Sequence, residues 1–193
     1  MLEKTLVVLK PDSVARGIVG DIISRFEKVG LKIVAAKFMN VSDELANTHY
    51  PTSRTEFIEG MGKKTLENYE ALGIDPVAEF GHADAHKIGL EIQKWLVDMI
   101  KSGPVFAFVL EGPHAVELVR KIVGHTLPIK AAPGTIRGDY SFDSSALANS
   151  GRRPIKNLIH ASGNKEEADF EISLWFKPEE IAHYERVEEK IMK

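Results

Sequence analysis

The stretch Val105-Phe106-Ala107-Phe108-Val109-Leu110 is an unbroken apolar run in the middle of the chain. A run of this length without polar alternation is typical of a strand that is buried on both faces of a sheet. Near the N-terminus, Thr5-Leu6-Val7-Val8-Leu9 is a second short run rich in β-branched residues, and Pro11 follows it, where the missing backbone N–H ends a ladder. The two stretches predict two buried strands.

Each predicted strand is followed by an amphipathic helix. After the first strand, Ile22, Phe26 and Val29 recur at helical spacing, and a second strand is expected over residues 31–39. After the central strand, apolar residues at the same spacing predict a helix over residues 114–123. This repeated order favours an α+β fold of the ferredoxin-like βαββαβ type, with a four-stranded antiparallel sheet and helices packed on it.

Two further helix starts carry N-terminal signals. Ser42 precedes Asp43 and Glu44, so a capping hydroxyl is followed by acids in the first turn. Pro178 precedes Glu179 and Glu180, which predicts the opening of a last helix.

Bulk composition excludes several classes of protein. The 193 residues are 44% hydrophobic and 27% charged, which is ordinary for one globular domain. A formal charge of -3 gives no basic excess, so neither nucleic acid nor an anionic membrane is expected as a main partner. There are no cysteines, which excludes disulfides and thiolate metal sites and fits a cytoplasmic location. The apolar part of the N-terminus, residues 6–9, is too short to span a bilayer.

The most reactive candidate lies in the stretch Asn157-Leu158-Ile159-His160-Ala161-Ser162-Gly163. A neutral imidazole can attack phosphorus, and a phosphohistidine divides one difficult transfer into two easier steps. Glu171 follows eleven positions after His160, where a carboxylate could fix the tautomer and orientation of the ring, and Ser162 could add a hydroxyl contact to the same group. In isolation His160 would be a polar residue at the end of a strand.

Three stretches together resemble the nucleoside diphosphate kinase family. They are Lys10-Pro11-Asp12, Pro133-Gly134-Thr135-Ile136-Arg137-Gly138-Asp139, and the histidine segment followed by Glu171-Ile172-Ser173-Leu174-Trp175-Phe176. The resemblance implies a ping-pong enzyme that transfers the terminal phosphoryl group from a nucleoside triphosphate such as ATP to a nucleoside diphosphate through a phosphohistidine at His160. It also implies Mg²⁺ held mainly by nucleotide phosphates and water, with no protein ligands, and a homo-oligomer that is a hexamer or a tetramer.

The resemblance also assigns roles to individual residues. The implied catalytic residues are His160, Glu171, Ser162 and Tyr50, and the implied nucleotide-binding residues are Lys10, Arg120, Thr126, Arg137 and Asn157. These types suit the chemistry, because a loose transition state that carries charge on phosphate oxygens needs converging cations. Arg137 lies between Gly134 and Gly138, where the backbone can approach a phosphate closely and the guanidinium can bind two oxygens.

Relative to the family, the chain is expected to be a single domain over residues 1–193 with helical insertions at about 51–101 and about 144–153. The first insertion contains an amphipathic helix around Trp95, which must bury its apolar side on its own domain or on a neighbouring subunit. The family's base-stacking phenylalanine falls at Ile58 by direct counting, with Phe57 one residue away, so either Phe57 or an insertion side chain is expected to contact the base.

Two sequence patterns are decoys. Residues 60–65 resemble a phosphate-binding loop, but Phe57 stands where that motif needs glycine and Lys64 where it needs Ser or Thr. His82 and His86 have metal-ligand spacing, but no third ligand is evident.

Two other classes of function remain open on sequence grounds. One is a catalytically silent nucleotide- or nucleic-acid-binding regulatory module on the same fold. The other is a relay protein that passes phosphate from histidine to another protein.

Overall fold

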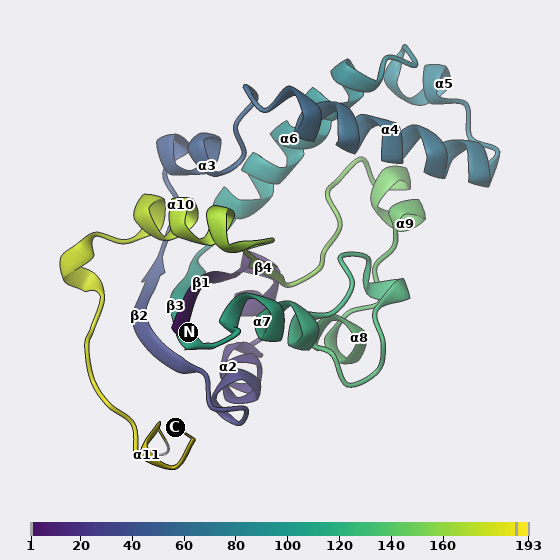
Figure 1. The fold of residues 1–193 in the computed structure, drawn as a ribbon. Helices are drawn as coiled ribbons and strands as arrows, with labels where there is room; N and C mark the ends of the chain where they lie inside the picture. The colour runs from purple at the N-terminus through teal and green to yellow at the C-terminus, as the bar shows by residue number, and fades with distance from the viewer. Residues whose placement is uncertain (1, 188, 193) are drawn as a thin grey trace.

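The computed structural model describes residues 2–187 and 189–192, which form one antiparallel sheet covered by helices on both faces (Figure 1). The strands are β1 (Leu2–Leu9), β2 (Lys32–Met39), β3 (Val105–Pro113) and β4 (Ile159–Ala161), in the spatial order β2-β3-β1-β4. Helix α2 (Val19–Glu27) connects the first two strands and α7 (Ala115–Val123) the last two. The predicted ferredoxin-like βαββαβ sandwich is confirmed.

The other elements surround this frame. The helices are α1 (Pro11–Ala15), α3 (Asp43–His49), α4 (Thr55–Leu72), α5 (Pro76–Phe80), α6 (Ala85–Lys101), α8 (Ile136–Tyr140), α9 (Ser145–Ser150), α10 (Lys165–Trp175) and α11 (Glu189–Met192), with 3₁₀ turns η1 (Pro128–Lys130) and η2 (Pro178–Glu180). Helix α3 begins as its sequence predicts, because the Ser42 hydroxyl accepts a hydrogen bond from the backbone N–H of Leu45.

The lack of polar alternation in β1 follows from its central position. Leu6 and Val8 lie in the core beneath α3, α6 and α10, whereas Val7 and Leu9 lie in the core beneath α2 and α7. All four side chains are fully buried. Burial of apolar area on both faces stabilises the sheet, and it fixes the end of β1, which Lys10 follows, and the neighbouring strand β4, in which His160 lies.

Helices α4 and α6 pack against each other as a long pair above the sheet (Figure 1). A Cβ atom on Gly62 or Gly89 would overlap the backbone of Ala85 or Ile58 on the facing helix, so glycine is required for this close approach. The decoy loop at residues 60–65 is therefore the interior of α4. On α6, Ile88 and Ile100 are fully buried and Trp95 stacks on Phe80, so the apolar side of this helix is covered by its own chain.

The predicted last helix at Pro178 is wrong, because only the three-residue turn η2 forms there. Beyond the turn, the chain runs along the outer edge of β2, where the Ala182 N–H donates to the carbonyl of Val34 at 2.7 Å and the Tyr184 hydroxyl donates to that of Ile33 at 2.8 Å. The edge strand β2 offers backbone carbonyl groups that no other described strand pairs with, and the segment after Pro178 binds them in place of forming a helix. The helix-start pattern at Pro178 is local and contains no information about this distant edge.

Candidate active site

His160 lies in β4 and is held by a carboxylate from α10. The Nε2 atom of His160 is 2.9 Å from both carboxylate oxygens of Glu171, and the Ser162 hydroxyl donates to Oε2 of Glu171 at 2.6 Å. The sequence prediction that these three side chains meet therefore agrees with the geometry. Within the described chain, no hydrogen bond involves Nδ1 of His160, and the residue lines a cavity.

Charge in this cluster favours one tautomer. Burial alone would raise the pKa of Glu171, but its contacts with His160, His49 and Ser162 outweigh that effect and lower the pKa. Glu171 is therefore a carboxylate at neutral pH and needs a donor, which places the proton of a neutral His160 on Nε2 and leaves the lone pair on Nδ1.

His49 is a member of the cluster that sequence reasoning missed. Its ring lies edge-on to the ring of His160, with centroids 4.5 Å apart, and edge-on to Trp175 at 5.5 Å. Burial, followed by the charge of His160, lowers the pKa of His49 to about 3, so this ring is neutral. A histidine next to the predicted Tyr50 was the only available signal, because α3 and β4 are far apart in sequence.

Tyr50 contacts His49, with ring centroids 4.6 Å apart, and lines the same cavity. Burial raises the pKa of its phenol, so the hydroxyl keeps its proton. The expected role of Tyr50 in orienting the ring of His160 would therefore act through His49.

Lys10, Asn157 and Thr126 form a connected polar group at the end of β1. The Lys10 ammonium donates to Oδ1 of Asn157 at 2.7 Å, and the Asn157 amide donates to the backbone carbonyl of Thr126 at 2.9 Å. Burial, followed by repulsion from Arg137, lowers the pKa of Lys10 to about 8. Because burial disfavours the charged ammonium of Lys10, a phosphate that binds next to it would stabilise that charged form.

Arg137 is buried and donates to three backbone carbonyl groups, those of Asn157 (3.1 Å), Gly124 (3.1 Å) and Ile159 (2.6 Å). A guanidinium has five N–H donors, so two remain for a phosphate. Burial, followed by repulsion from Arg120, lowers the pKa of Arg137 to about 10, so it stays charged at neutral pH. The sequence predicted a phosphate ligand here, and the structure adds a second role in holding the backbone around His160.

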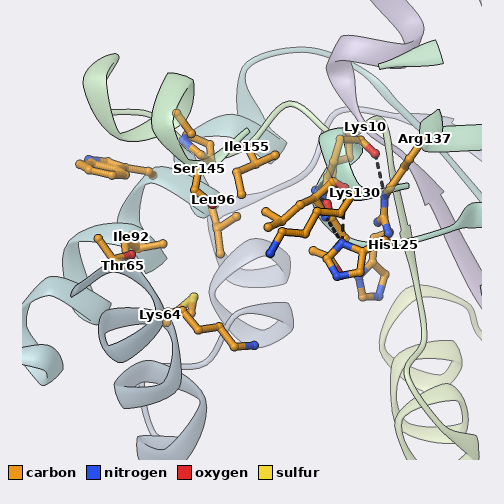
Figure 2. Close-up of a pocket in the computed structure, with 18 of the residues that line it drawn as sticks. Lys10, Lys64, Thr65, Ile92, Leu96, His125, Lys130, Arg137, Ser145 and Ile155 are labelled. Atoms are coloured by element: carbon orange, nitrogen blue, oxygen red, sulfur yellow. Dashed lines mark hydrogen bonds between the residues drawn. The ribbon is translucent and has the colours of Figure 1, made fainter. Parts of the chain in front are cut away.

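A cavity of about 630 Å³ joins these side chains (Figure 2). Six of the predicted residues besides His160 line it: Lys10, Tyr50, Arg120, Thr126, Arg137 and Asn157. Glu171 and Ser162 are buried at the His160 ring and are not among the lining residues. The volume is within the range of small-ligand sites, and the concentration of cations at one end fits a polyanion.

The opposite side of the cavity comes from the expected insertions. Figure 2 shows Lys64, Thr65 and Ile92 of α4 and α6 on the side away from Lys10 and Arg137. Phe57 lines this cavity, whereas Ile58 is fully buried beneath it. Phe57, one of the expected candidates for base stacking, therefore has its ring at the cavity, whereas the position reached by direct counting does not.

The described residues contain a single cluster of three or more potential metal ligands, made by His49, His160 and Glu171. Two of its three donors are imidazoles, whereas Mg²⁺ prefers oxygen ligands, so the cluster does not fit that ion. His82 and His86 belong to no such cluster in the described part of the chain.

This fold, with a carboxylate-held histidine at a cavity lined by cations, fits the class of phosphotransferases that act through a histidine. The sequence pattern of the nucleoside diphosphate kinase family matches residues 3–63 and 83–181, which leaves residues 64–82, within the first expected insertion, unmatched. The nucleoside diphosphate kinase of Pyrobaculum aerophilum is 52% identical over 180 residues, covering 93% of this chain and 98% of that protein.

Two solved structures are similar over nearly the whole chain. The crystal structure of the Pyrobaculum aerophilum NDP kinase has a TM-score of 0.92 at 50% identity and covers 95% of this chain and 100% of that one. A transition-state mimic of the Borrelia burgdorferi nucleoside-diphosphate kinase with bound vanadate and ADP has a TM-score of 0.76 at 41% identity and covers 97% of this chain and 95% of that one. The chain belongs to the nucleoside diphosphate kinase family and is a phosphotransferase of that type.

Proposed function

We propose that the protein transfers the terminal phosphoryl group of a nucleoside triphosphate to a nucleoside diphosphate in two steps, with Nδ1 of His160 as the nucleophile. The observation that carries the proposal is the contact of Nε2 with Glu171 at 2.9 Å, which leaves Nδ1 without a partner in the described chain at a cavity lined by cations. The carboxylate holds the Nε2 proton in place, so the imidazole needs no tautomer change before it attacks.

In the first step, Nδ1 forms a bond to the terminal phosphorus while the bond from that phosphorus to the bridging oxygen breaks, and the nucleoside diphosphate leaves with the electron pair. In the second step, a terminal oxygen of another nucleoside diphosphate attacks the phosphohistidine and the phosphorus–nitrogen bond breaks. Lys10, Arg120 and Arg137 neutralise the developing oxygen charge. Mg²⁺ would be held by the phosphates of the bound nucleotide and by water, and it would neutralise part of the phosphate charge.

The proposal is tested with γ-labelled ATP and magnesium. Wild-type protein should acquire one acid-labile, alkali-stable label and should pass it to added GDP. Transfer to GDP in a purified mixture contradicts a relay to another protein, since no protein acceptor is present. Salt-sensitive oligonucleotide binding without any label would favour a silent nucleic-acid-binding module.

Lys10 gives the reaction a basic limb in its pH dependence. Its pKa of about 8 means that the free enzyme loses this positive charge as the pH rises through that value, which weakens phosphate binding. We expect kcat/KM to fall by up to about tenfold per pH unit above pH 8. The measurement is a steady-state profile from pH 7 to 9.5. In Lys10→Arg, whose guanidinium stays charged, the same limb should disappear at a lower overall activity; a flat wild-type profile contradicts the role of Lys10.

Phe57 is proposed to stack on the base. Phe57→Ala should raise KM for all nucleoside diphosphates by about 5- to 150-fold, because base–aromatic stacking contributes about 1–3 kcal/mol. Phe57→Tyr keeps the aromatic face and should stay close to wild type. Ile58→Val is the matched control, since Ile58 is buried and does not line the cavity. Equal KM values for Phe57→Ala and Ile58→Val would assign the base to another wall.

We also propose that the protein is a cytoplasmic homo-oligomer, a hexamer or a tetramer. The side chains of Phe142 and Ile129 are 81% and 65% exposed in the single chain. Because burial of large apolar side chains is favourable, these two residues support a subunit contact on the surface that carries them. Within the described residues, no helix has both the length and the apolar character needed to cross a membrane. Light scattering of the purified protein measures the subunit number.

A further inference from the structure

Leu158, two residues before His160, has an unusual backbone conformation. Its φ of 70° is in the left-handed region, which only two other non-glycine residues adopt in the described chain, His114 and Arg152. The cost for a residue with a Cβ is about 1–2 kcal/mol, and such residues persist where their surroundings determine the conformation. The Leu158 side chain is buried in the core beneath α2 and α7, so a relaxed backbone would remove it from that core.

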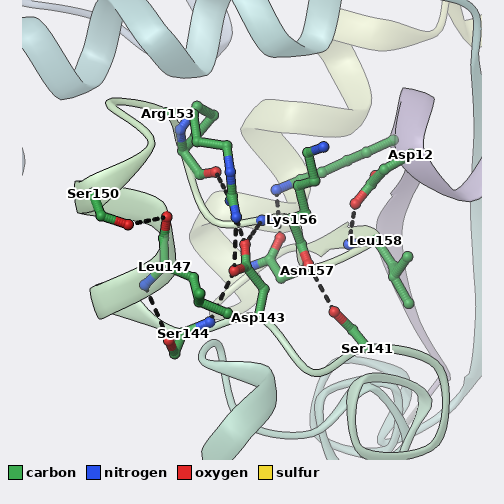
Figure 3. A network of polar contacts seen from close by, with 12 residues as sticks. Asp12, Ser141, Asp143, Ser144, Leu147, Ser150, Arg153, Lys156, Asn157 and Leu158 are labelled. Atoms are coloured by element: carbon green, nitrogen blue, oxygen red, sulfur yellow. Dashed lines mark hydrogen bonds and ion pairs between the residues drawn. The ribbon is translucent and has the colours of Figure 1, made fainter.

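One short segment holds both backbone polar groups of Leu158. Its N–H donates to Oδ2 of Asp12 at 3.0 Å (Figure 3). Its carbonyl accepts from the Ser13 hydroxyl at 2.6 Å and from the backbone N–H of Lys10 at 2.8 Å. Asp12 also accepts the Ser13 N–H through its other oxygen at 3.2 Å. We refer to the contacts of Lys10, Asp12 and Ser13 with Leu158 as the Leu158 clamp.

The groups next to Leu158 are those that the reaction uses. Asn157 precedes it and binds the Lys10 ammonium, and Ile159 follows it and gives its carbonyl to Arg137. Rotation of the Leu158 peptide would therefore withdraw Asn157 from Lys10 and displace His160 relative to the cavity. A displacement of about 1 Å in a reacting group is enough to cost about 100-fold in rate.

Lys156, two residues before Leu158, is fixed in a similar way from the other side. The Lys156 N–H donates to Asp143 at 2.7 Å, and its carbonyl accepts from the Ser141 hydroxyl at 2.8 Å (Figure 3). Asp143 is buried and is also paired with Arg153. Hydrogen bonds with Asp143 and Ser141 thus hold the backbone at Lys156, and the left-handed conformation at Leu158 depends on the hydrogen bond to Asp12.

We propose that Asp12 and Ser13 are positioning residues of the phosphoryl-transfer site, which act by holding Leu158 in its left-handed conformation so that Asn157 and His160 face the cavity together. The inference rests on the proposed function of His160. No hydrogen bond joins Asp12 to His160 in the described structure, so the hydrogen bond of Asp12 to Leu158 would act on His160 through the backbone.

The test separates the hydrogen bond of Asp12 from its charge, because its negative charge also lies near Lys10 and Arg137. Asp12→Ala removes both properties, whereas Asp12→Asn removes the charge and keeps an oxygen that can accept the Leu158 N–H. The readouts are the single-turnover rate of phosphohistidine formation from ATP and the Kd for ADP by calorimetry.

For Asp12→Ala we expect the rate of phosphohistidine formation to fall by about 100-fold while the Kd for ADP changes less than about fivefold. Asp12→Asn should recover the rate to within about fivefold of wild type, since the bond to Leu158 is retained. Ser13→Ala leaves the Lys10 N–H on the Leu158 carbonyl and should lower the rate by about 3- to 10-fold, and it serves if Asp12→Ala does not fold.

Two outcomes overturn the inference. One is phosphorylation of Asp12→Ala, or of Ser13→Ala if the former is unfolded, at the wild-type rate. The other is a rate for Asp12→Asn as low as that of Asp12→Ala, which would assign the effect to charge. Wild-type protein that carries no label on His160 would instead refute the proposed function itself, so the two failures are distinguishable.

Discussion

His160→Gln should abolish labelling by γ-labelled ATP and lower phosphoryl transfer to GDP by at least about four orders of magnitude, as loss of a catalytic nucleophile commonly does. Glutamine is the informative replacement because its amide can still donate to the buried carboxylate of Glu171, which otherwise loses its main partner. The variant therefore removes the nucleophilic lone pair with little change to the surrounding cluster. One measurement is the amount of labelled phosphoprotein, detected under alkaline conditions in which the label is stable. The other is the turnover rate in a coupled assay.

The control for this substitution is nucleotide binding. The cations that line the cavity are untouched in His160→Gln, so its Kd for ADP should stay within about threefold of wild type, as expected for a change confined to the reacting atom. Label on the glutamine variant at the wild-type level would show that another residue accepts the phosphoryl group.

The fold was predictable from sequence because its signals are local and repeated. The apolar runs at residues 5–9 and 105–110 are central strands, since a strand covered on both faces has no polar side. The predicted family and enzyme class are likewise confirmed. The last helix was predicted wrongly, because the carbonyl groups of Ile33 and Val34 at the edge of β2 draw the chain after Pro178 into an extended path.

The parts of the site that sequence reasoning missed depend on contacts between distant segments. His49 joins the cluster only because α3 and β4 meet beneath α10, and its position next to Tyr50 is the single local sign of that role. The Leu158 clamp could not be predicted for the same reason, because no local sequence pattern indicates a leucine with a left-handed backbone conformation. The chemistry of side chains could be predicted from motifs, but the backbone contacts that position them could not.

Arg137→Lys should both destabilise the protein and remove most of its activity. The three carbonyl groups that Arg137 binds lie in different directions around a buried side chain, and a lysine ammonium cannot reach all of them. Each buried acceptor without a donor costs about 1–3 kcal/mol, so we expect the free energy of unfolding to fall by about 2–5 kcal/mol. Turnover should fall by about 10²- to 10³-fold, because the same change loosens Asn157 and weakens charge neutralisation at the phosphate. Denaturant unfolding and kcat at saturating nucleotide measure the two effects.

Arg120→Lys separates the two roles of arginine at this site. Arg120 also lines the cavity, but it is exposed, and its guanidinium has no hydrogen bond within the described residues. Its replacement should therefore leave the free energy of unfolding within about 0.5 kcal/mol of wild type, while weaker phosphate binding raises KM by about tenfold. If Arg137→Lys behaved like Arg120→Lys, with normal stability and only a raised KM, its three carbonyl contacts would not be what holds the backbone around His160. A joint loss of stability and kcat that occurs only in Arg137→Lys would show that one buried cation has two roles. It would hold the backbone at Asn157 and Ile159, and it would also bind the transferred phosphate. The position of the nucleophile and the charge at the phosphate would then depend on the same side chain.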